Sequence, residues 1–486
     1  MTFHAELVLC VAVAGLACVS AAMAADASKD LVVNGDFAAE GPGGMPAGWT
    51  VWKPLWEKAA CAVRRDRGGL LVEAPRTPQL EPWAVGGAWQ DLAGVRGGQA
   101  YAVLAEAKVS QVHRPFEGIT VRLTWMRGGT PLHPAGMYVR LKGIAGGLRT
   151  SGLPAKTWQA GRAGDPPPVI RPDDAVFDDV LAAPPEADGA RLALEVKWPH
   201  NGTVIWKRVS VRPTDPPPPR KVKVGTVYLR PKNSTPEKNM ALWCAKIDEA
   251  GRLGLDIVCL GEAILQVGTP KTAADLAEPV PGPSTGQLGA AARRNKLWVV
   301  AGLTERQGDR LYNTAVLLNR EGGLVGTYRK VHLPREEWQK GITPGGEYPV
   351  FQTEFGTIAI QICYDWFFPE AAEIFALKGA EILFAPTWGS TLPDADGRAE
   401  GETVFRVRAR DNGLYLVPSV YDGSSMVIDP MGRILVSNQG AEGVFWKEID
   451  LAAREPLWWV GRWRDIGPRD RMPDTYGPLT DHPGQP

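Results

Sequence analysis

The stretch that decides the fold of the C-terminal half of the chain runs from Thr357 to Glu370 and reads TIAIQICYDWFFPE. Its first six residues are an apolar run of strand length, and the residues after Cys363 have the pattern of a turn that enters a helix. A cysteine on such a turn projects its sulfur at the helix start, where backbone N–H groups stabilise a thiolate. The stretch therefore predicts a strand, a turn bearing a cysteine, and a helix.

Apolar strands and amphipathic helices alternate on both sides of this stretch. Predicted helices at 239–251 and 284–296 each lead into a strand, at 256–260 and 297–302. This alternation is typical of a layered α/β domain. The other strands that we expect are at 314–318, 357–362, 381–385, 414–420 and 425–428, with a hairpin at 319–323.

Two more polar residues follow apolar strands directly, as Cys363 does. Glu262 comes after the run IVCLG, and Lys330 ends the run VGTYRK. Open α/β sheets place their sites at such strand ends. Taken singly, a lysine is usually a solvated charge, a glutamate a surface or capping residue, and a cysteine after a strand a core residue. Their common order along one domain is what makes a catalytic site the better reading.

In this order and sequence context, Glu262, Lys330 and Cys363, which are 68 and 33 residues apart, resemble the nitrilase or carbon–nitrogen hydrolase superfamily. The resemblance runs from about Lys221 to the C-terminus. It implies a four-layer α-β-β-α sandwich and a homodimer or higher oligomer. It is carried by LGE at 260–262, YRKVHLP at 328–334, CYD at 363–365, FPE at 368–370 and GAEILFAPTW at 379–388, with further echoes in YNTA at 312–315 and RARDNG at 408–413.

The resemblance also implies a role for each residue. Glu262 is expected to be the general base that activates Cys363, which forms a thioester with the substrate. Lys330, with the backbone N–H of Tyr364, is expected to stabilise the oxyanion. The family has a second glutamate after the lysine. Its spacing to Pro344 and Gly345 favours Glu337, and Glu336 stays open as the alternative.

The residues after the cysteine bear on the substrate. The tripeptide CYD resembles amidase and carbamoyl-hydrolase branches, whereas branches acting on nitriles tend to have a glutamate at position 365. We therefore expect a small-molecule amide or N-carbamoyl substrate. Tyr364, Trp366 and Trp388 are candidate substrate-binding residues, and for the two tryptophans a core role is an equal alternative. The rival functions are acyl transfer to an amine through the same thioester, and an inert glycan-binding protein of the cell envelope.

Other chemistries find little support in the sequence. It contains no HExxH, no CxxC pair, no Walker loop and no GxSxG, and its histidines are scattered. We expect no metal and no cofactor. Lys and Arg number 54 and Asp and Glu also 54, and this balance argues against a nucleic-acid partner, which usually requires a basic surface. A composition of 44% hydrophobic residues excludes wholesale disorder.

Four consecutive prolines at 216–219 predict an extended spacer over 216–220 that neither helix nor sheet can use. The spacer divides the chain into residues 26–215 and 221–486. The first segment carries short alternating runs, which predict an antiparallel β-sandwich. These runs lie at 101–109, 119–125, 191–196 and 204–211, and a second proline cluster at 165–168 predicts a loop.

The opening of this segment, LVVNGDF at 31–37 with PAGW at 46–49, resembles the start of jelly-roll carbohydrate-binding modules of the galactose-binding-like group. A glycan is therefore a candidate partner. The segment is also rich in tryptophan, which serves both in cores and in platforms that stack on sugars. The sequence leaves both uses open for Trp49, Trp52, Trp56, Trp83 and Trp89.

The N-terminus predicts a signal peptide over residues 1–25. Leu7 to Val19 is an apolar run too short to span a bilayer, and Ala22-Met23-Ala24 supplies a small-x-small cleavage site. Cleavage after Ala24 or Ala25 implies a secreted or periplasmic protein. The first six residues carry no Lys or Arg, which leaves an uncleaved anchor as the alternative. The four remaining cysteines are irregularly spaced and imply no disulfide framework.

Overall fold

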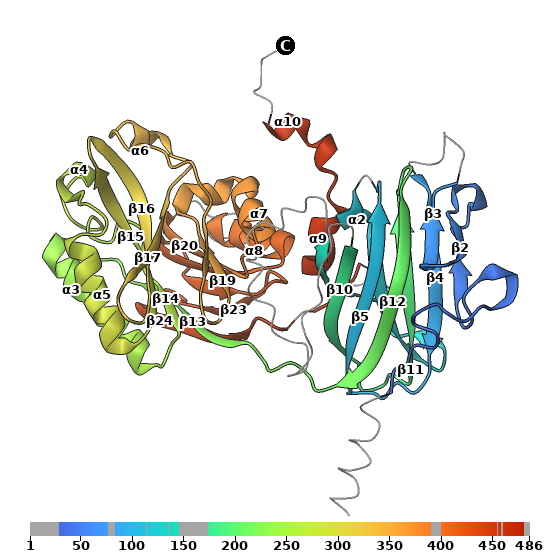
Figure 1. Cartoon of the computed structure of the whole chain (residues 1–486). Helices are drawn as coiled ribbons and strands as arrows, with labels where there is room; N and C mark the ends of the chain where they lie inside the picture. The colour runs from blue at the N-terminus through green and yellow to red at the C-terminus, as the bar shows by residue number, and fades with distance from the viewer. Residues whose placement is uncertain are drawn as a thin grey trace, which may run out of the picture. The chain divides into compact units, whose positions relative to one another are not determined.

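The computed structural model describes residues 29–75, 83–112, 114–134, 136–144, 174–389, 400–453, 455–457 and 460–480. The predicted signal peptide and the proline cluster at 165–168 lie outside these residues. The chain forms two compact units. We call Pro219–Glu455 the α/β unit, and the described residues before and after it the sandwich unit (Figure 1).

The α/β unit contains two six-stranded sheets. The strands of the first sheet, in spatial order, are β17 (Leu324–Arg329), β16 (Arg310–Leu318), β15 (Trp298–Gln307), β14 (Ile257–Cys259), β13 (Lys221–Tyr228) and β24 (Gly443–Asp450). The strands of the second are β18 (Val350–Gln352), β19 (Thr357–Ile360), β20 (Ile382–Gly389), β21 (Tyr415–Asp422), β22 (Met426–Ile428) and β23 (Ile434–Ser437). Each sheet has parallel strands at its centre and antiparallel strands at its edges.

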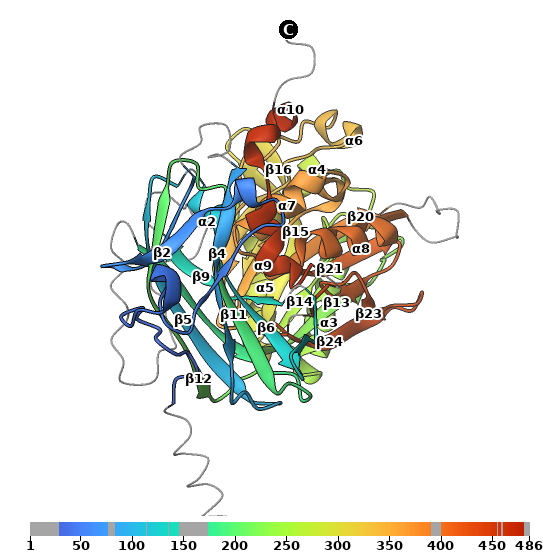
Figure 2. The same cartoon turned by 90° about the vertical axis from the view of Figure 1, so that its right-hand side faces the viewer.

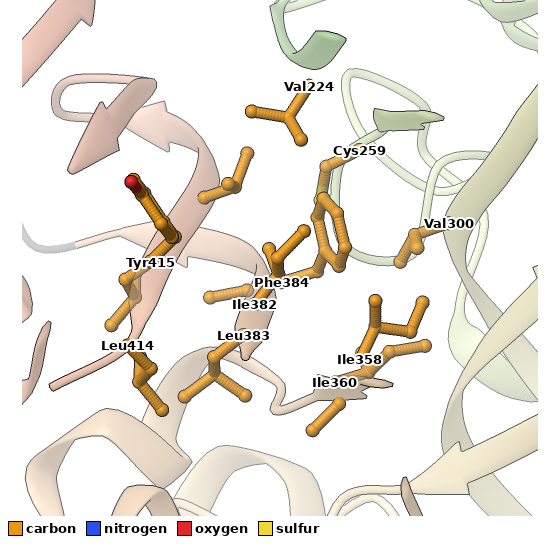
Figure 3. Close-up of a cluster of buried hydrophobic side chains, with 14 of the residues drawn as sticks. Val224, Cys259, Val300, Ile358, Ile360, Ile382, Leu383, Phe384, Leu414 and Tyr415 are labelled. Carbon is orange, nitrogen blue, oxygen red and sulfur yellow. The ribbon is translucent and has the colours of Figure 1, made fainter. Parts of the chain in front are cut away.

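The two sheets share a core, because alternate side chains of their central strands point to the same interior. Ile257 and Cys259 of β14 join Ile358 and Ile360 of β19 and Phe384 of β20 in one cluster of buried residues. Figure 3 shows side chains from both sheets meeting in this cluster. Burial of about 25 cal/mol per Å² of apolar area makes this interior the main source of the unit's stability.

Helices cover the outer side of each sheet. Trp243 of α3 (Pro236–Arg252) and Leu288 of α5 (Pro283–Asn295) pack on Val258 and Val299 in a second cluster. The other sheet is covered by α7 (Pro369–Leu377) and α8 (Glu400–Asn412), which bury Phe375 and Phe405. The order helix, sheet, sheet, helix gives an α/β architecture. The short helices of the unit are α4 (Ala273–Leu276), α6 (Arg335–Trp338) and the 3₁₀ helix η4 (Cys363–Phe367).

The sandwich unit consists of two antiparallel six-stranded sheets around one hydrophobic core. One sheet contains β1 (Thr50–Trp52), β4 (Val85–Leu92), β11 (Gly189–Lys197), β6 (Ile119–Arg127), β7 (Thr130–Pro131) and β8 (Met137–Tyr138). The other contains β2 (Ala62–Asp66), β3 (Gly69–Glu73), β12 (Thr203–Thr214), β5 (Ala100–Ser110), β10 (Asp174–Ala182) and β9 (Leu141–Ile144). Figure 2 shows β4, β11 and β6 side by side. The likeness to a galactose-binding-like module remains a prediction.

The five tryptophans of this unit for which the sequence leaves core and sugar-stacking roles open do not share one surface. Trp49 is buried in the core and stacks at an angle on Phe37, while Trp56 and Trp83 are about 60% exposed. Trp52 and Trp89 lie together on one sheet. Core and surface positions are therefore divided among the five tryptophans.

The proline run lies in an exposed stretch without helix or strand between β12 and β13. The sequence predicts that the second domain continues to residue 486. In the structure the α/β unit ends at Glu455, and the described residues from Pro456 onward belong to the sandwich unit. Arg469 of α9 (Trp463–Asp470) is buried there and donates to the carbonyl oxygens of Phe116 and Ile119. Arg462 donates to the carbonyl oxygen of Tyr138 over 3.1 Å. No described helix is long and apolar enough to cross a membrane.

Candidate active site

Four of the residues singled out in the sequence come together at one end of the α/β sheets. Glu262 lies three residues after β14, Lys330 directly after β17, Glu337 on α6, and Cys363 three residues after β19. Lys330 and Glu262 are buried, and Glu337 and Cys363 are half-buried. Strand ends of both sheets therefore supply the cluster, as the sequence predicted for Glu262, Lys330 and Cys363.

Lys330 is the centre of the cluster. Its Nζ lies 3.0 Å from Oε1 of Glu262 and 2.7 Å from Oε1 of Glu337. Burial acts to lower the pKa of Lys330, but the neighbouring carboxylates and the Cys363 sulfur outweigh it and hold the pKa well above its usual value. The ammonium is therefore charged throughout the neutral range, and two carboxylates offset it within hydrogen-bond distance.

Both oxygens of Glu262 are engaged. Oε1 accepts from Lys330 and, over 2.7 Å, from Nδ2 of Asn313. Among the described residues, Oε2 accepts one hydrogen bond, from the backbone N–H of Trp388 over 2.6 Å. A carboxylate has about four lone-pair sites, so Oε2 retains one for a further proton. The Trp388 N–H also acts on the Cys363 sulfur. Oε2 is thus the oxygen on the side of the thiol.

Close backbone packing fixes Glu262 in this place. A side chain on Gly302 of β15 would come within 2.7 Å of the Glu262 Cα, and one on Gly261 would collide with the Tyr421 ring. The Tyr421 hydroxyl donates to the Glu262 carbonyl oxygen over 2.6 Å. Only glycine at these two positions lets the strands approach the base so closely.

Cys363 sits on a strained backbone between β19 and η4. Its φ is +41°, in the left-handed region that non-glycine residues rarely adopt. Such strain persists where the surrounding structure imposes it, and it collects at functional sites. The predicted strand, turn and helix are present, although the turn continues as the short helix η4 before α7 begins.

The surroundings of Cys363 disfavour ionisation of its thiol. Burial raises its pKa to about 12 and the Glu262 carboxylate adds to the rise, while Lys330 and the backbone N–H groups of Gly389 and Trp388 act in the opposite direction. The sequence suggested that a cation and a helix start would ionise the thiol. In the folded chain the negative charge of the neighbouring glutamate and burial prevail, so a base must take the proton during the reaction.

Glu336 and Glu337, the two candidates for the second glutamate, differ in position. Glu336 is exposed, whereas Glu337 bonds to Lys330 and accepts from Asn313 over 3.1 Å. Burial raises the pKa of Glu337; Lys330 opposes this shift and Glu262 adds to it. Oε2 of Glu337 and Oδ1 of Asn313 are buried without a hydrogen-bond partner among the described residues. Two acceptors are therefore open at the cluster.

A second buried carboxylate, Asp365, follows Cys363 by two residues on η4. It accepts from the Tyr328 hydroxyl over 2.7 Å, from the Ile362 N–H over 2.9 Å, and from the N–H of His332 over 3.0 Å. The His332 Nδ1 is a further 2.8 Å neighbour. Because Tyr328 and His332 flank Lys330, Asp365 ties the cysteine turn to the lysine segment.

The three candidate substrate-binding residues have different surroundings. Trp388 is 36% exposed beside Glu262 and packs edge-on against Tyr421. Trp366 is buried and stacks on Phe367, in the core of the unit. Tyr364 packs on Phe367 and Phe368. Trp366 also borders a cavity of about 10 Å³, enough for one water molecule, whose other lining residues include Thr387, Gly389, Phe405, Val420 and Asp422.

Sequence reasoning assigned no role to Asn313 or Tyr421. Asn313 was noted only as part of YNTA, yet its amide bridges the two glutamates. Its signal was a polar residue inside an otherwise apolar strand run. Tyr421 follows the predicted strand at 414–420 directly, and no feature of the sequence points from it to Glu262. Within the described part of the chain, no group of His, Cys, Asp and Glu side chains is arranged to hold a metal ion.

Comparison with known proteins places this unit in a family. The model of the carbon–nitrogen hydrolase family matches residues 223–457. A nitrilase of Pyrococcus abyssi is 32% identical over 47% of this chain and 90% of its own length. The deaminated glutathione amidase of Mus musculus is 32% identical over 51% of this chain and 83% of its own length. The mouse omega-amidase is 29% identical over 45% of this chain and 85% of its own length.

Among solved structures, a carbon–nitrogen hydrolase from Helicobacter pylori covers 54% of this chain and 99% of its own length, with 25% identity and a TM-score of 0.47. The sequence matches extend over most of the length of each relative, and the family model is confined to the unit that holds the buried lysine and its glutamates. The chain therefore belongs to the carbon–nitrogen hydrolase family of the nitrilase superfamily and is an amidase-type enzyme.

Proposed function

We propose that the α/β unit hydrolyses the C–N bond of small, non-peptide amide or N-carbamoyl substrates through a thioester on Cys363. The observation that carries the proposal is the buried Lys330 ammonium, bonded to Glu262 and Glu337 beside a cysteine on a strained turn. A merely structural ion pair would not require a neighbouring thiol or open acceptors. The proposed trio of base, cation and nucleophile does.

Acylation couples transfer of the thiol proton from Cys363 to Glu262 with attack of the sulfur on the substrate. Oε2 of Glu262 is the accepting atom, because Oε1 is already filled by Lys330 and Asn313. The sulfur attacks the carbonyl carbon of the substrate. The π electrons of the C=O bond move onto the oxygen, which becomes an oxyanion. Since the resting pKa of the thiol is about 12, this transfer accompanies attack rather than preceding it.

The oxyanion needs a donor that is in place before it forms. Lys330 supplies it through Nζ, and the backbone N–H of Tyr364 is the second candidate. One such donor contributes about 3–4 kcal/mol in enzymes where it has been measured. Glu262 then passes its proton to the leaving nitrogen, the C–N bond breaks, and ammonia or an amine departs. The acyl group remains on sulfur.

Deacylation repeats the sequence with water. Glu262 accepts a proton from the water molecule, the resulting hydroxide equivalent attacks the thioester, and Glu262 returns the proton to the Cys363 sulfur as the acid product leaves. Glu337 and Asn313 hold the side chains of Glu262 and Lys330 in position through hydrogen bonds. The Oε2 atom of Glu337, which is buried without a hydrogen-bond partner among the described residues, is the acceptor available to the N–H groups of a primary amide or carbamoyl substrate.

The test is an assay of the full-length chain on a panel of aliphatic amides, N-carbamoyl compounds and nitriles, with ammonia and the acid product both quantified. Release of both in equal amounts from amides or carbamoyl compounds, lost in Cys363→Ala, supports the proposal. Cys244→Ala is the matched control, because Cys244 is also a half-buried free cysteine but lies on α3. Activity that survives Cys363→Ala, or no turnover of any panel member, would overturn it.

A further inference from the structure

The first sheet of the sandwich unit carries a hollow on its outward face. Strand registers place Trp89 opposite Thr50 and Ala193, and Ala193 opposite Arg122. Alternate residues of these strands, such as Leu192 and Leu194, point into the core. Because side chains alternate along a strand, Trp89, Ala193 and Arg122 share the other face. The same alternation adds Trp52, Gly87, Thr124, Arg191 and Glu195 to it.

The hollow has one small residue, Ala193, among its lining side chains. Ala193 lies in the middle of β11, and larger side chains of the neighbouring strands surround it. The result is a cavity of about 200 Å³. This is smaller than the roughly 300–1,000 Å³ that binds drug-sized ligands, so it suits a single ring-sized unit. The lining residues are Trp52, Trp89, Arg122, Thr124, Met126, Pro131, Pro134, Arg191, Ala193 and Glu195.

Two indole rings on an outward sheet face require an explanation, because such a face is usually polar. Both Trp52 and Trp89 are partly exposed. The Arg191 guanidinium lies 3.7 Å from the Trp89 ring centre and covers one part of it. Among the described residues of this face, no guanidinium lies over the Trp52 ring. Partly exposed indoles next to a cavity offer apolar flat surface to a ligand ring.

The polar groups of the hollow are paired into neutral sets. Glu195 accepts from Arg122 Nη2 and, over 3.1 Å, from the Thr120 hydroxyl. Arg191 bonds to both oxygens of Asp91, over 2.7 and 2.9 Å. Each guanidinium is thus balanced by a carboxylate. The hollow offers donors and acceptors side by side without excess charge, which suits vicinal hydroxyl groups better than a charged ligand.

We propose that this hollow binds one sugar ring of a neutral saccharide, with the ring face on Trp52 and the hydroxyl groups on the Arg122–Glu195 pair and Thr124. The site belongs to the sandwich unit alone and is independent of the hydrolysis proposed above. Of the five tryptophans for which the sequence leaves a sugar-stacking role open, the site uses Trp52 and Trp89, together with a charge-balanced polar wall.

The test titrates the full-length chain with four neutral probes, the β-1,4-linked tetraoses of glucose, galactose, mannose and xylose, by calorimetry and tryptophan fluorescence. Trigalacturonate and adenosine are added as a charged saccharide and an aromatic base. We expect at least one neutral tetraose to bind, and Trp52→Ala to weaken it by about tenfold or more. Trp56→Ala is the matched control, since Trp56 is exposed but does not line the hollow.

Ala193→Gln provides a second variant that fills the hollow without removing a wall, and thermal unfolding shows whether each variant is folded. Loss of saccharide binding in folded Ala193→Gln supports the site even where Trp52→Ala fails to fold. Absence of binding by all four tetraoses, binding of trigalacturonate or adenosine alone, or equal effects of Trp52→Ala and Trp56→Ala would overturn the proposal.

Discussion

The two buried carboxylates near the cysteine turn, Glu262 and Asp365, differ in how completely hydrogen-bond donors surround them. Asp365 is surrounded by donors from Tyr328, His332 and Ile362. Glu262 faces a lysine, an amide and one backbone N–H, and it keeps an open lone pair toward the thiol. A closed set of partners holds the backbone in place, whereas an open one can exchange a proton. A carboxylate thus has a structural role at position 365 and the proposed catalytic role at position 262.

The largest effect that separates the two carboxylates is expected from Glu262→Gln. An amide of the same shape cannot take the thiol proton, so kcat should fall by about 10²–10⁴-fold, the usual contribution of a general base. The thermal unfolding midpoint should change little, because Glu337 still pairs with Lys330. Steady-state kinetics on the best amide of the panel and a thermal melt check both values. A near-native kcat in Glu262→Gln would contradict the proposed role of Glu262 as the general base.

The same isosteric change at Asp365 should act mainly on stability. Asp365→Asn places an amide N–H₂ among groups that are themselves donors, and hydrogen bonds to a charged acceptor contribute about 1.5–3 kcal/mol each. We expect a loss of about 2–4 kcal/mol in the free energy of unfolding, measured in urea by following tryptophan fluorescence. If Asp365→Asn lowered kcat without lowering stability, the distinction between the two carboxylates would fail.

Alkylation of Cys363 tests whether Glu262 and burial raise the pKa of its thiol. Because the pKa of the thiol is raised to about 12, the thiolate fraction should grow about tenfold per pH unit, or about 100-fold from pH 7 to 9, without a plateau. The measurement is the rate of iodoacetamide labelling of Cys363 by mass spectrometry, in a Cys244→Ala background.

The variants should shift this rate in opposite directions. Glu262→Gln removes a negative charge that raises the thiol pKa, so labelling at pH 8 should be faster. Lys330→Met removes a positive charge that lowers it, so labelling should be slower. A plateau near pH 7 in the unmodified chain would instead reveal a thiolate at rest.

The smallest effect is expected at Asn313, which contacts both glutamates of the open cluster. Asn313→Ala leaves Glu262 and Glu337 tied only through Lys330, so kcat should fall by about tenfold while KM stays nearly constant. A positioning role requires this separation of kcat from KM. An increase in KM with unchanged kcat would assign Asn313 to substrate binding instead.

The open cluster could be predicted from the sequence because its members sit at strand ends with distinctive neighbours. The positions of Glu262, Lys330 and Cys363 follow from local pattern and family resemblance. The surroundings of Asp365 could not be predicted in this way. Two of its donors, the Tyr328 hydroxyl and the His332 N–H, lie more than 30 residues before it in the sequence. Position 365 was read as a guide to the substrate, and in the structure its side chain faces the interior.

The strands and helices of the α/β unit were also predictable where one face of an element is apolar. The predicted helices at 239–251 and 284–296 correspond to α3 and α5 within a few residues. The edge strand β24 and the docking of α9 were missed. Their residues alternate weakly, and they are held by partners far away in sequence, such as β13 for the first and Phe116 for the second.

The return of α9 to the sandwich unit means that this unit is assembled from both ends of the polypeptide. A recombinant fragment that stops at the proline run would lack Ile466 and Arg469, and it would leave the carbonyl oxygens of Phe116 and Ile119 without their donor. A stand-alone version of the sandwich unit should therefore include residues 456–480. A designed linker would connect them to the N-terminal segment in place of the α/β unit.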